Sequence, residues 1–330
     1  MKDFPAIPKD SAAHSGPRPG AGVAGDVSGL MIDAALATKL AQQWINPRLN
    51  VTAVERLHGG MIHQTCQWIT DGEPAAIVAK VNRLERIETL RREAAGLTWY
   101  RRHTQLPVPE PYACAEVPEA GLGVLMLEKI HGTTLDQARL SQRGQRHFQQ
   151  ELARHVAALH HHHRDQFGSP LAQESYPRWL DAFAPMFHRH FEAVRDQLST
   201  RSRQIIEHTL THLERWLPPQ ARPTLIHGDL WATNILVDDS HPHQPRIMAF
   251  IDGAPTYSDP EYELAYLRLF NTADSTFFAA YAREHPIHPG FEQRCRIYWL
   301  ATMLLHVQQF GPRCVPACES LAEQIRQMAG

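Results

Sequence analysis

Two aspartates and an asparagine in the second half of the chain have the types and spacing needed for phosphate chemistry. Asp229 follows a short apolar run, Asn234 comes five residues later, and Asp252 directly follows a second apolar run. Oxygen ligands of this kind suit Mg²⁺, and a carboxylate can take the proton of an attacking hydroxyl. We therefore predict a phosphoryl transfer in which Asp229 is the catalytic base and Asn234 and Asp252 bind Mg²⁺.

The order of these residues is more specific than any one of them. A single Asp after Gly is ordinary turn chemistry. Here the chain reads strand, His-Gly-Asp, four residues, Asn, strand, and then Asp at the end of a further strand. This is the order of the catalytic loop and metal-binding segment of protein kinases. A purely structural interpretation explains a lone Asp229 but not the full order, which favours a kinase that uses ATP.

A lysine and a glutamate in the first half could hold the phosphates of the nucleotide. Lys80 lies at the end of an apolar β-like run, where kinases place the lysine that contacts the α- and β-phosphates. A solvated lysine at a strand end is the alternative. Glu93, on the helix that follows, is the predicted partner that holds Lys80 toward the nucleotide, although Glu85 and Glu88 share that helix.

Two further segments could contact the nucleotide through the backbone. Gly59 and Gly60 lie in the turn between two expected strands, where a chain without Cβ atoms can approach phosphates closely. An ordinary hairpin turn is the alternative there. A later strand leads into the expected linker between two lobes, and backbone groups of that linker are the predicted adenine contacts: Met126, Glu128 and Lys129.

The elements that must position these residues differ between the two halves of the chain. The first half predicts two helices, at residues 32–44 and 84–103, and five strands, at residues 51–57, 64–70, 75–81, 112–117 and 123–127. Asp71 and Gly72 predict a hairpin turn between the second and third strands. The second half predicts long helices with only short extended runs between them. Those helices are expected at residues 134–162, 177–217, 261–281 and 289–310, and the extended runs at 223–226, 235–237 and 247–251.

This order predicts an α+β fold with two lobes and a cleft between them. A small antiparallel β lobe at residues 31–128 would bind the nucleotide. A larger, mainly helical lobe at residues 129–330 would supply catalysis and the acceptor site. Residues 1–30 are rich in Pro, Gly, Ala and Ser, and we expect them to form a flexible tail.

Composition narrows the function classes further. The chain has 330 residues, of which 43% are hydrophobic and 21% charged, and its formal net charge is −2. That balance lacks the basic character of a nucleic-acid binder. No run of about 18 apolar residues predicts a membrane span, and no signal peptide is evident. Five scattered cysteines predict reduced thiols, so we expect a cytoplasmic protein. Because neither nucleic-acid binding nor a membrane span is indicated, we expect the protein to act on a small molecule.

Two polar clusters are interpreted as structural. Four consecutive histidines occupy residues 160–163, but on a helix only His160 and His163 could face one ligand. A solvated helix end is therefore favoured over a metal site. Glu261 and Glu263 follow a proline at an expected helix start, where carboxylates favour the helix dipole, so acid catalysis is not assigned to them.

Several segments together resemble one known family. They are GGMIHQ at residues 59–64, KVN at 80–82, EAAGL at 93–97, PEP at 109–111, HGDLW at 227–231 with Asn234, IDGA at 251–254 and YSDPEYELA at 257–265. These motifs, spread over roughly residues 50–320, resemble the fructosamine kinase (ketosamine kinase) family of the aminoglycoside phosphotransferase superfamily, which has a protein-kinase-like fold.

The resemblance implies ATP as phosphate donor, Mg²⁺ as metal and a sugar-derived hydroxyl as acceptor. Ketosamines are the first candidates for the acceptor molecule. It also implies that Trp231 borders the acceptor site, although a tryptophan buried beneath the catalytic loop is the alternative. A natural-product O-phosphotransferase, acting on an aminoglycoside or nucleoside, would share every residue on the ATP side. A nucleotide-binding pseudokinase is the third possibility, and the intact set of polar residues argues against it. The oligomeric state is not predicted.

Overall fold

The computed structural model describes residues 30, 32–57, 63–217 and 221–329, and these form two compact units. The sheet unit comprises the described part of Ala24–Phe148 together with Ala232–Ala254. The helical unit comprises the described part of Gln149–Trp231 and of Pro255–Gly330. The predicted lobes are continuous in sequence, whereas these units are not, because a hairpin from the second half belongs to the sheet unit.

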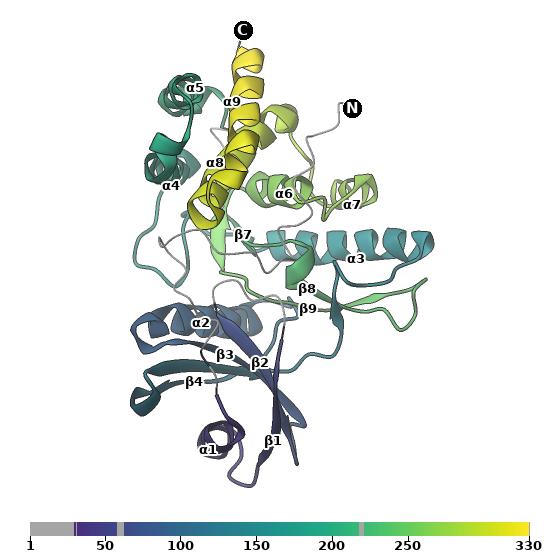
Figure 1. The fold of residues 1–330 in the computed structure, drawn as a ribbon. Helices are drawn as coiled ribbons and strands as arrows, with labels where there is room; N and C mark the ends of the chain where they lie inside the picture. Colours follow the sequence, from purple (N-terminus) through teal and green to yellow (C-terminus); the bar gives the residue numbers. More distant parts are fainter. Residues whose placement is uncertain (1–29, 31, 58–62, 218–220, 330) are drawn as a thin grey trace. The chain divides into compact units, whose positions relative to one another are not determined.

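The sheet unit contains a five-stranded antiparallel sheet in the order β1-β2-β3-β5-β4 (Figure 1). Its strands are β1 (Val51–Arg56), β2 (Gln64–Thr70), β3 (Ala76–Arg83), β4 (Pro111–Val117) and β5 (Leu122–Glu128). Helix α1 (Ala34–Trp44) begins at Asp33, whose carboxylate accepts the amide of Leu36 at 2.8 Å. Such an N-cap satisfies an amide that has no partner within the helix. Helix α2 (Ile87–His103) follows β3.

Side chains alternate between the two faces of this sheet, and that alternation decides where Lys80 points. Ala79 and Val81 belong to a buried apolar cluster that also contains α1. Because successive residues of a strand face opposite sides, Lys80 lies on the other face. That face is covered by α2, which contacts β3, β4 and β5. The sheet therefore directs Lys80 toward α2.

A second, smaller sheet completes this unit. It joins β6 (Thr133–Thr134), β8 (Ile235–Asp238) and β9 (Arg246–Phe250) in antiparallel order. Helix α3 (Gln142–His160) starts beside it, and a Cβ added at Gly144 would meet the carbonyl oxygen of Pro242 at 2.0 Å. Only glycine allows the helix to approach the β8–β9 connection this closely.

The helical unit is built around α8. Its elements are α4 (Trp179–Val194), α5 (Thr200–Thr211), α6 (Pro260–Leu269), α7 (Ser275–Tyr281), α8 (Phe291–Phe310) and α9 (Val315–Ala329), with a two-stranded sheet of β7 (Thr224–Ile226) and β10 (Thr256–Ser258). Helix α8 is buried on several sides and contacts α4, α6 and α9. Phe183, Phe187 and Phe191 recur every four residues on α4, so they form one buried stripe.

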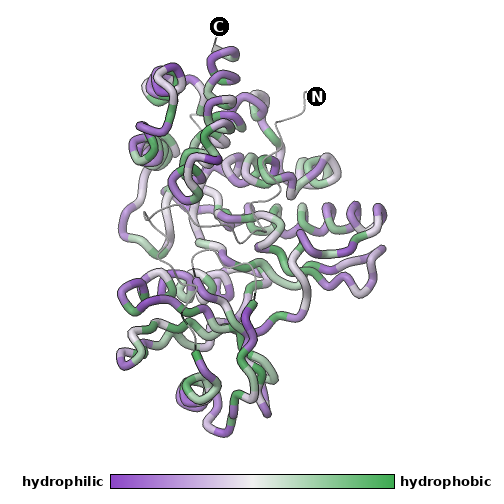
Figure 2. Tube along the Cα trace, in the orientation of Figure 1, coloured by the Kyte–Doolittle hydropathy of each residue, from purple (hydrophilic) through white to green (hydrophobic). Residues whose placement is uncertain are grey.

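Figure 2 shows hydrophobic and hydrophilic residues alternating along the outer helices. None of the described helices has the length and apolar character needed to cross a bilayer.

The predicted α+β class is confirmed, and the strands lie close to their predicted positions. Several helix predictions were too long. The helix expected from residue 134 begins only at Gln142, because Thr133 and Thr134 pair with β8. The helix expected at 177–217 is interrupted after Val194, and the one expected at 261–281 is interrupted near Asn271, whose φ is 53°. Strands β6 and β10 and helix α9 were not predicted.

Candidate active site

The hairpin of β8 and β9 brings the two predicted metal ligands to the same end. Ile235 pairs with Phe250, and the amide of Ile251 donates to the carbonyl oxygen of Asn234 at 3.0 Å. Asn234 is therefore opposite Ile251, next to Asp252 in the chain. The pairing of two short apolar strands explains why residues 18 positions apart in sequence become neighbours. The sequence predicted both residues, and their adjacency follows from the strand register.

Asp252 has an unusual backbone for a residue with a side chain. Its φ is 63°, in the left-handed region that residues other than glycine seldom adopt. Such conformations persist where the surrounding structure requires them, and they are concentrated at functional sites. The Asp252 side chain is 41% exposed although its neighbours Phe250 and Gly253 are buried. The turn therefore presents this carboxylate to solvent or to a ligand.

Lys80 is held by two carboxylates, that of Glu93, its predicted partner, and that of Asp252, which was predicted as a metal ligand. Its Nζ lies 2.5 Å from Oε1 of Glu93 and also donates to Oδ1 of Asp252. The side chains of Lys80 and Glu93 are 10% and 12% exposed. Burial alone would lower the pKa of Lys80, but Asp252 and Glu93 outweigh burial and raise it, so the ammonium stays charged. Glu85 and Glu88 do not make this contact, which resolves the choice among the three glutamates in favour of Glu93.

A histidine and an asparagine lie beside this cluster, and the sequence assigned no role to either. His63 Nδ1 lies 2.8 Å from Nδ2 of the fully buried Asn82. Burial, followed by the charge of Lys80, lowers the pKa of His63 to about 4, so the ring is neutral at pH 7. A neutral imidazole adds no charge to a phosphate site but can still donate or accept a hydrogen bond. Both residues lie in motifs that carry the family resemblance, His63 in GGMIHQ and Asn82 in KVN, but neither motif indicated that the two side chains would meet.

The other residues predicted to contact the nucleotide are placed as follows. Gly59 and Gly60 lie outside the described residues. Met126 is in the interior of β5, paired with β3 and β4, and its side chain is fully buried in the core. Glu128 ends that strand, and its carboxylate accepts the amide of Glu110 at 3.0 Å. Lys129 follows it and is partly exposed. The end of β5 therefore offers Glu128 and Lys129, rather than the side chain of Met126, for a backbone contact.

The loop that carries Asp229 belongs to the helical unit and is tied down by α6. Gly228 has a φ of 86°, and its amide donates to Oε1 of Glu263 at 2.8 Å. Oε2 of the same carboxylate lies 3.1 Å from Nε2 of His160, whose Nδ1 lies 2.7 Å from the Tyr281 hydroxyl. One buried carboxylate therefore joins the loop that carries Asp229 to α3.

The interpretation of His160 as part of a solvated helix end was wrong. Its ring is fully buried, because the last turn of α3 packs against α6 and α7 rather than facing solvent. Glu261 and Glu263 do occupy the first turn of α6, as predicted, but both are buried and act through specific partners. Glu261 pairs with Arg294 of α8, with Nη2 and Oε1 2.8 Å apart.

Asp229 also receives a hydrogen bond that the sequence did not predict. The hydroxyl of Tyr266, on α6, donates to Oδ1 of Asp229 at 2.5 Å. The Tyr266 ring packs on Phe270 with centroids 4.7 Å apart, and Phe270 also contacts Trp231 at 5.9 Å. Trp231 is partly exposed rather than buried in the core. Asp229 is thus adjacent to an aromatic surface, which is a common lining for a sugar or a small organic ligand.

These residues fit a magnesium site of the kind kinases use. Within the described ranges, no three His, Cys, Asp or Glu side chains gather into a metal-binding group. Mg²⁺ does not require one, because it keeps several waters and takes phosphate oxygens from its substrate. One carboxylate from Asp252 and one amide oxygen from Asn234 are a sufficient protein contribution. The donor set is all oxygen, as a hard cation demands.

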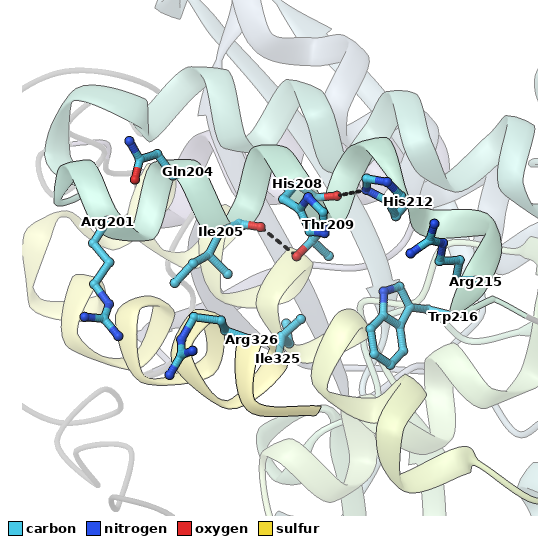
Figure 3. Close-up of a pocket in the computed structure, with 10 residues that line it drawn as sticks. All are labelled: Arg201, Gln204, Ile205, His208, Thr209, His212, Arg215, Trp216, Ile325 and Arg326. Carbon is cyan, nitrogen blue, oxygen red and sulfur yellow. Dashed lines mark hydrogen bonds between the residues drawn. The ribbon is translucent and has the colours of Figure 1, made fainter. Parts of the chain in front are cut away.

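A separate groove lies between α5 and α9 in the helical unit and has a volume of about 460 Å³ (Figure 3). None of the predicted site residues lines it. Its arginines give it a basic character, but Arg201 and Arg326 are both paired with Glu323 of α9. The groove therefore carries less positive charge than its composition indicates, and we do not assign the catalytic site to it.

Comparison with known proteins decides the family. The sequence model of the fructosamine kinase family matches residues 33–328. This chain belongs to that family. The mouse ketosamine-3-kinase is 27% identical to it over 294 residues, which cover 79% of this chain and 91% of the mouse protein. The chain is therefore a kinase by membership, and its acceptor group is a hydroxyl.

Solved structures show the same fold. A putative fructosamine-3-kinase from Haemophilus somnus superposes with a TM-score of 0.69 at 19% identity, covering 88% of this chain and 96% of that one. The aminoglycoside phosphotransferase APH(4)-Ia superposes with a TM-score of 0.64 at 18% identity, covering 90% and 99%. The predicted kinase-like fold is thereby confirmed. At these identities the likeness concerns the fold.

Proposed function

We propose that this protein transfers the γ-phosphate of ATP to a hydroxyl of a ketosamine. The observation that carries the proposal is the cluster of Lys80, Glu93 and Asp252. A buried lysine is costly unless it is paired, and here both partners are the residues that phosphate chemistry requires. A structural ion pair would need one carboxylate. The second, on a strained and exposed turn, is explained by a role toward a ligand.

On the nucleotide side, Lys80 contacts the α- and β-phosphates and Glu93 fixes its direction. Asn234 and Asp252 hold Mg²⁺, which offsets the charge that develops on the phosphate oxygens during transfer. Lys80 stays protonated because Asp252 and Glu93 raise its pKa. The neutral His63 and Asn82 border this site without changing its charge. Gly59, Gly60, Glu128 and Lys129 remain predicted backbone contacts.

On the acceptor side, Asp229 orients the hydroxyl and accepts its proton. The hydroxyl oxygen forms a bond to the γ-phosphorus while the bond from that phosphorus to the bridging oxygen breaks, and ADP leaves with the electron pair. The proton passes to the Asp229 carboxylate. Trp231 and Phe270 supply an aromatic surface beside it. Residues 229–234 form one continuous segment, so the base and one metal ligand are linked by five peptide bonds.

A ketosamine is proposed as the acceptor because the family and its relatives are named for that chemistry. The mouse relative is a ketosamine-3-kinase, and an Arabidopsis relative, 25% identical, is a protein-ribulosamine 3-kinase. Both names specify an amino-linked ketose and a hydroxyl at its third carbon. The corresponding reaction here is O-phosphorylation of a fructosamine- or ribulosamine-type molecule.

The test is ADP release from the purified protein with MgATP and a panel of acceptors. The panel contains fructosyl- and ribulosyl-lysine, amino sugars, aminoglycosides and nucleosides. We expect turnover with the ketosamines, and the Asp229→Asn variant to lose about two to four orders of magnitude in kcat. The matched control is Asp165→Asn, an exposed aspartate of the same unit.

Three outcomes would overturn parts of the proposal. Turnover confined to aminoglycosides or nucleosides would replace the ketosamine with a natural-product acceptor. Absence of turnover with every acceptor, together with intact nucleotide binding, would indicate a pseudokinase. Normal turnover by Asp229→Asn would remove Asp229 from the role of base.

A further inference from the structure

The side chain of Asp229 is held by a tyrosine of the same unit. The Tyr266 hydroxyl donates to its Oδ1 at 2.5 Å, and both residues belong to the helical unit. Burial, with the charge of Asp229 next, raises the pKa of Tyr266 well above its ordinary value of 10. The phenol therefore keeps its proton at any physiological pH. Tyr266 acts toward Asp229 as a donor only.

The helix that carries Tyr266 is fixed at several points, so the donor is held in place. Glu263 precedes Tyr266 by three residues and accepts the amide of Gly228. Residues three apart lie on the same face of a helix. One face of α6 therefore holds the loop twice, through the backbone at Gly228 and through the side chain at Asp229.

The beginning of α6 is anchored as firmly. Asp259 caps the helix through the amide of Glu261 at 3.0 Å and accepts the Tyr298 hydroxyl at 2.6 Å. Glu261 forms its buried ion pair with Arg294. The ring of Tyr266 itself packs against Phe270, which also contacts His306 of α8 at 5.3 Å. These contacts leave the Tyr266 hydroxyl little freedom to turn away from Asp229.

We propose that Tyr266 is a positioning residue that orients the Asp229 carboxylate toward the acceptor hydroxyl and keeps it ionised. The proposal rests on the proposed function, because it assigns Asp229 as the base. A hydrogen bond donated to a carboxylate favours its charged form. A base must be charged to accept a proton, and its oxygen must face the hydroxyl. Tyr266 meets both needs without touching the acceptor.

Other groups near Asp229 come from three segments. Tyr262 and Tyr266 belong to α6, and His306 of α8 interacts electrostatically with Asp229. His227 lies on the same loop, where its Nδ1 accepts the Asp229 amide at 3.4 Å. Burial lowers the pKa of His306, so it is neutral at pH 7. Among these groups, the Tyr266 hydroxyl donates a hydrogen bond to Oδ1 of Asp229.

The test removes one oxygen and nothing else. Tyr266→Phe keeps the ring that packs on Phe270, and Tyr257→Phe is the matched control, since Tyr257 is a buried tyrosine of the same unit. The titration of the Asp229 carboxyl carbon is followed by ¹³C NMR and assigned with Asp229→Asn. We expect its midpoint to rise by about one pH unit in Tyr266→Phe and to stay unchanged in the control. No substrate is required for this measurement.

Kinetics supply the second readout. We expect kcat to fall roughly ten- to hundredfold in Tyr266→Phe, with the acidic limb of its pH profile moved upward and the KM for ATP unchanged. A residue that only supported the fold would leave that limb in place. Fluorinated tyrosine at position 266 is a stronger donor of nearly the same shape, so it should move the Asp229 midpoint downward. This second variant keeps the test valid if Tyr266→Phe is unstable.

The outcomes separate the two proposals. An unchanged Asp229 midpoint in both Tyr266 variants overturns the positioning role, whatever the activity. Shifted midpoints in a protein that phosphorylates no acceptor would overturn the proposed function while leaving the contact between Tyr266 and Asp229 in force. Shifted midpoints with unchanged kcat and pH profile would show that the hydrogen bond exists but does not serve catalysis, which also overturns the inference.

Discussion

Lys80 is held in place by residues that come from distant parts of the chain. Glu93 reaches it from α2, 13 residues away, and Asp252 from the end of β9, 172 residues away. Two acids around one buried base leave a net negative charge, and a cation beside Asp252 would balance it. The same arrangement explains why Lys80 stays charged despite burial. At the residue scale, this cluster supports the proposed phosphate site over a purely structural ion pair.

Replacing Glu93 by Gln should impair the enzyme through Lys80. The variant removes the charge of one of the two carboxylates that pair with Lys80. Asp252 is then the remaining charged partner of Lys80, although it is also the proposed Mg²⁺ ligand. We expect kcat/KM for ATP to fall at least about tenfold, the equivalent of one charged hydrogen bond. Glu88→Gln is the control, because Glu88 lies on the same helix but is exposed and pairs with Arg91. Equal effects of the two substitutions would contradict the pairing of Lys80 with Glu93.

Helix α6 is the element on which the helical part of the site depends. Its first residues include an N-cap aspartate and two glutamates, and these three contact the buried Tyr298, Arg294 and His160, respectively. Tyr266 extends the same face by one turn. The sequence indicated the start of this helix from Pro260. It did not indicate that the first turn would be buried, because burial depends on α3 and α8 packing over it.

The buried cap of α6 predicts a pH dependence. Burial, followed by the charge of Glu261, raises the pKa of Asp259 to about 6, from an ordinary value of 3.8. The folded state therefore binds a proton more tightly than the unfolded chain between these values. This contribution to stability is fully present below about pH 3.8 and is lost as the pH rises through 6.

Comparison with Asp259→Asn isolates that contribution, because the amide does not titrate and other groups cancel in the difference. The free energy of unfolding of both proteins is measured in urea from pH 4 to 7. We expect the free energy of unfolding of the wild type, relative to that of Asp259→Asn, to fall by about 2–3 kcal/mol from pH 4 to pH 7. A difference that does not vary with pH would show that Asp259 ionises as it does in the unfolded chain.

For the molecule as a whole, the predicted roles divide between the two units. Lys80, Glu93, Asn234 and Asp252 all belong to the sheet unit, and Asp229 and Trp231 to the helical unit. The segment of residues 229–234 runs from one to the other. Nucleotide binding should therefore depend on the first set, and proton transfer on the second.

Thermal unfolding with and without MgATP tests this division. A ligand that binds only the folded state stabilises it by about 2.7 kcal/mol at a hundred times its dissociation constant. We expect wild type and Asp229→Asn to show the same rise in Tm, and Asp252→Asn a smaller one. Chelation of Mg²⁺ should reduce the rise in wild type. Loss of the rise in Asp229→Asn alone would contradict the assignment of nucleotide binding to the sheet unit.

Much of the site could be read from local sequence. The strand before Lys80, the HGD turn with Asn234, and Asp252 after an apolar run are each defined by neighbours within a few residues, because strands and turns are specified by short patterns. Helix ends were less certain: the sequence did not reveal that Thr133 and Thr134 would pair with β8.

Contacts between distant segments were decided only by the tertiary structure. Three examples are the hydrogen bond from Tyr266 to Asp229, the contact of His63 with Asn82 and the contact of the buried His160 with Tyr281. The two residues of each pair are between 19 and 121 positions apart in the sequence. A single sequence carries no local signal for such contacts, because they depend on how helices and strands pack. The sequence by itself therefore determined the fold class and indicated the proposed chemistry, whereas packing determined which charged residues are buried and which side chain contacts Asp229.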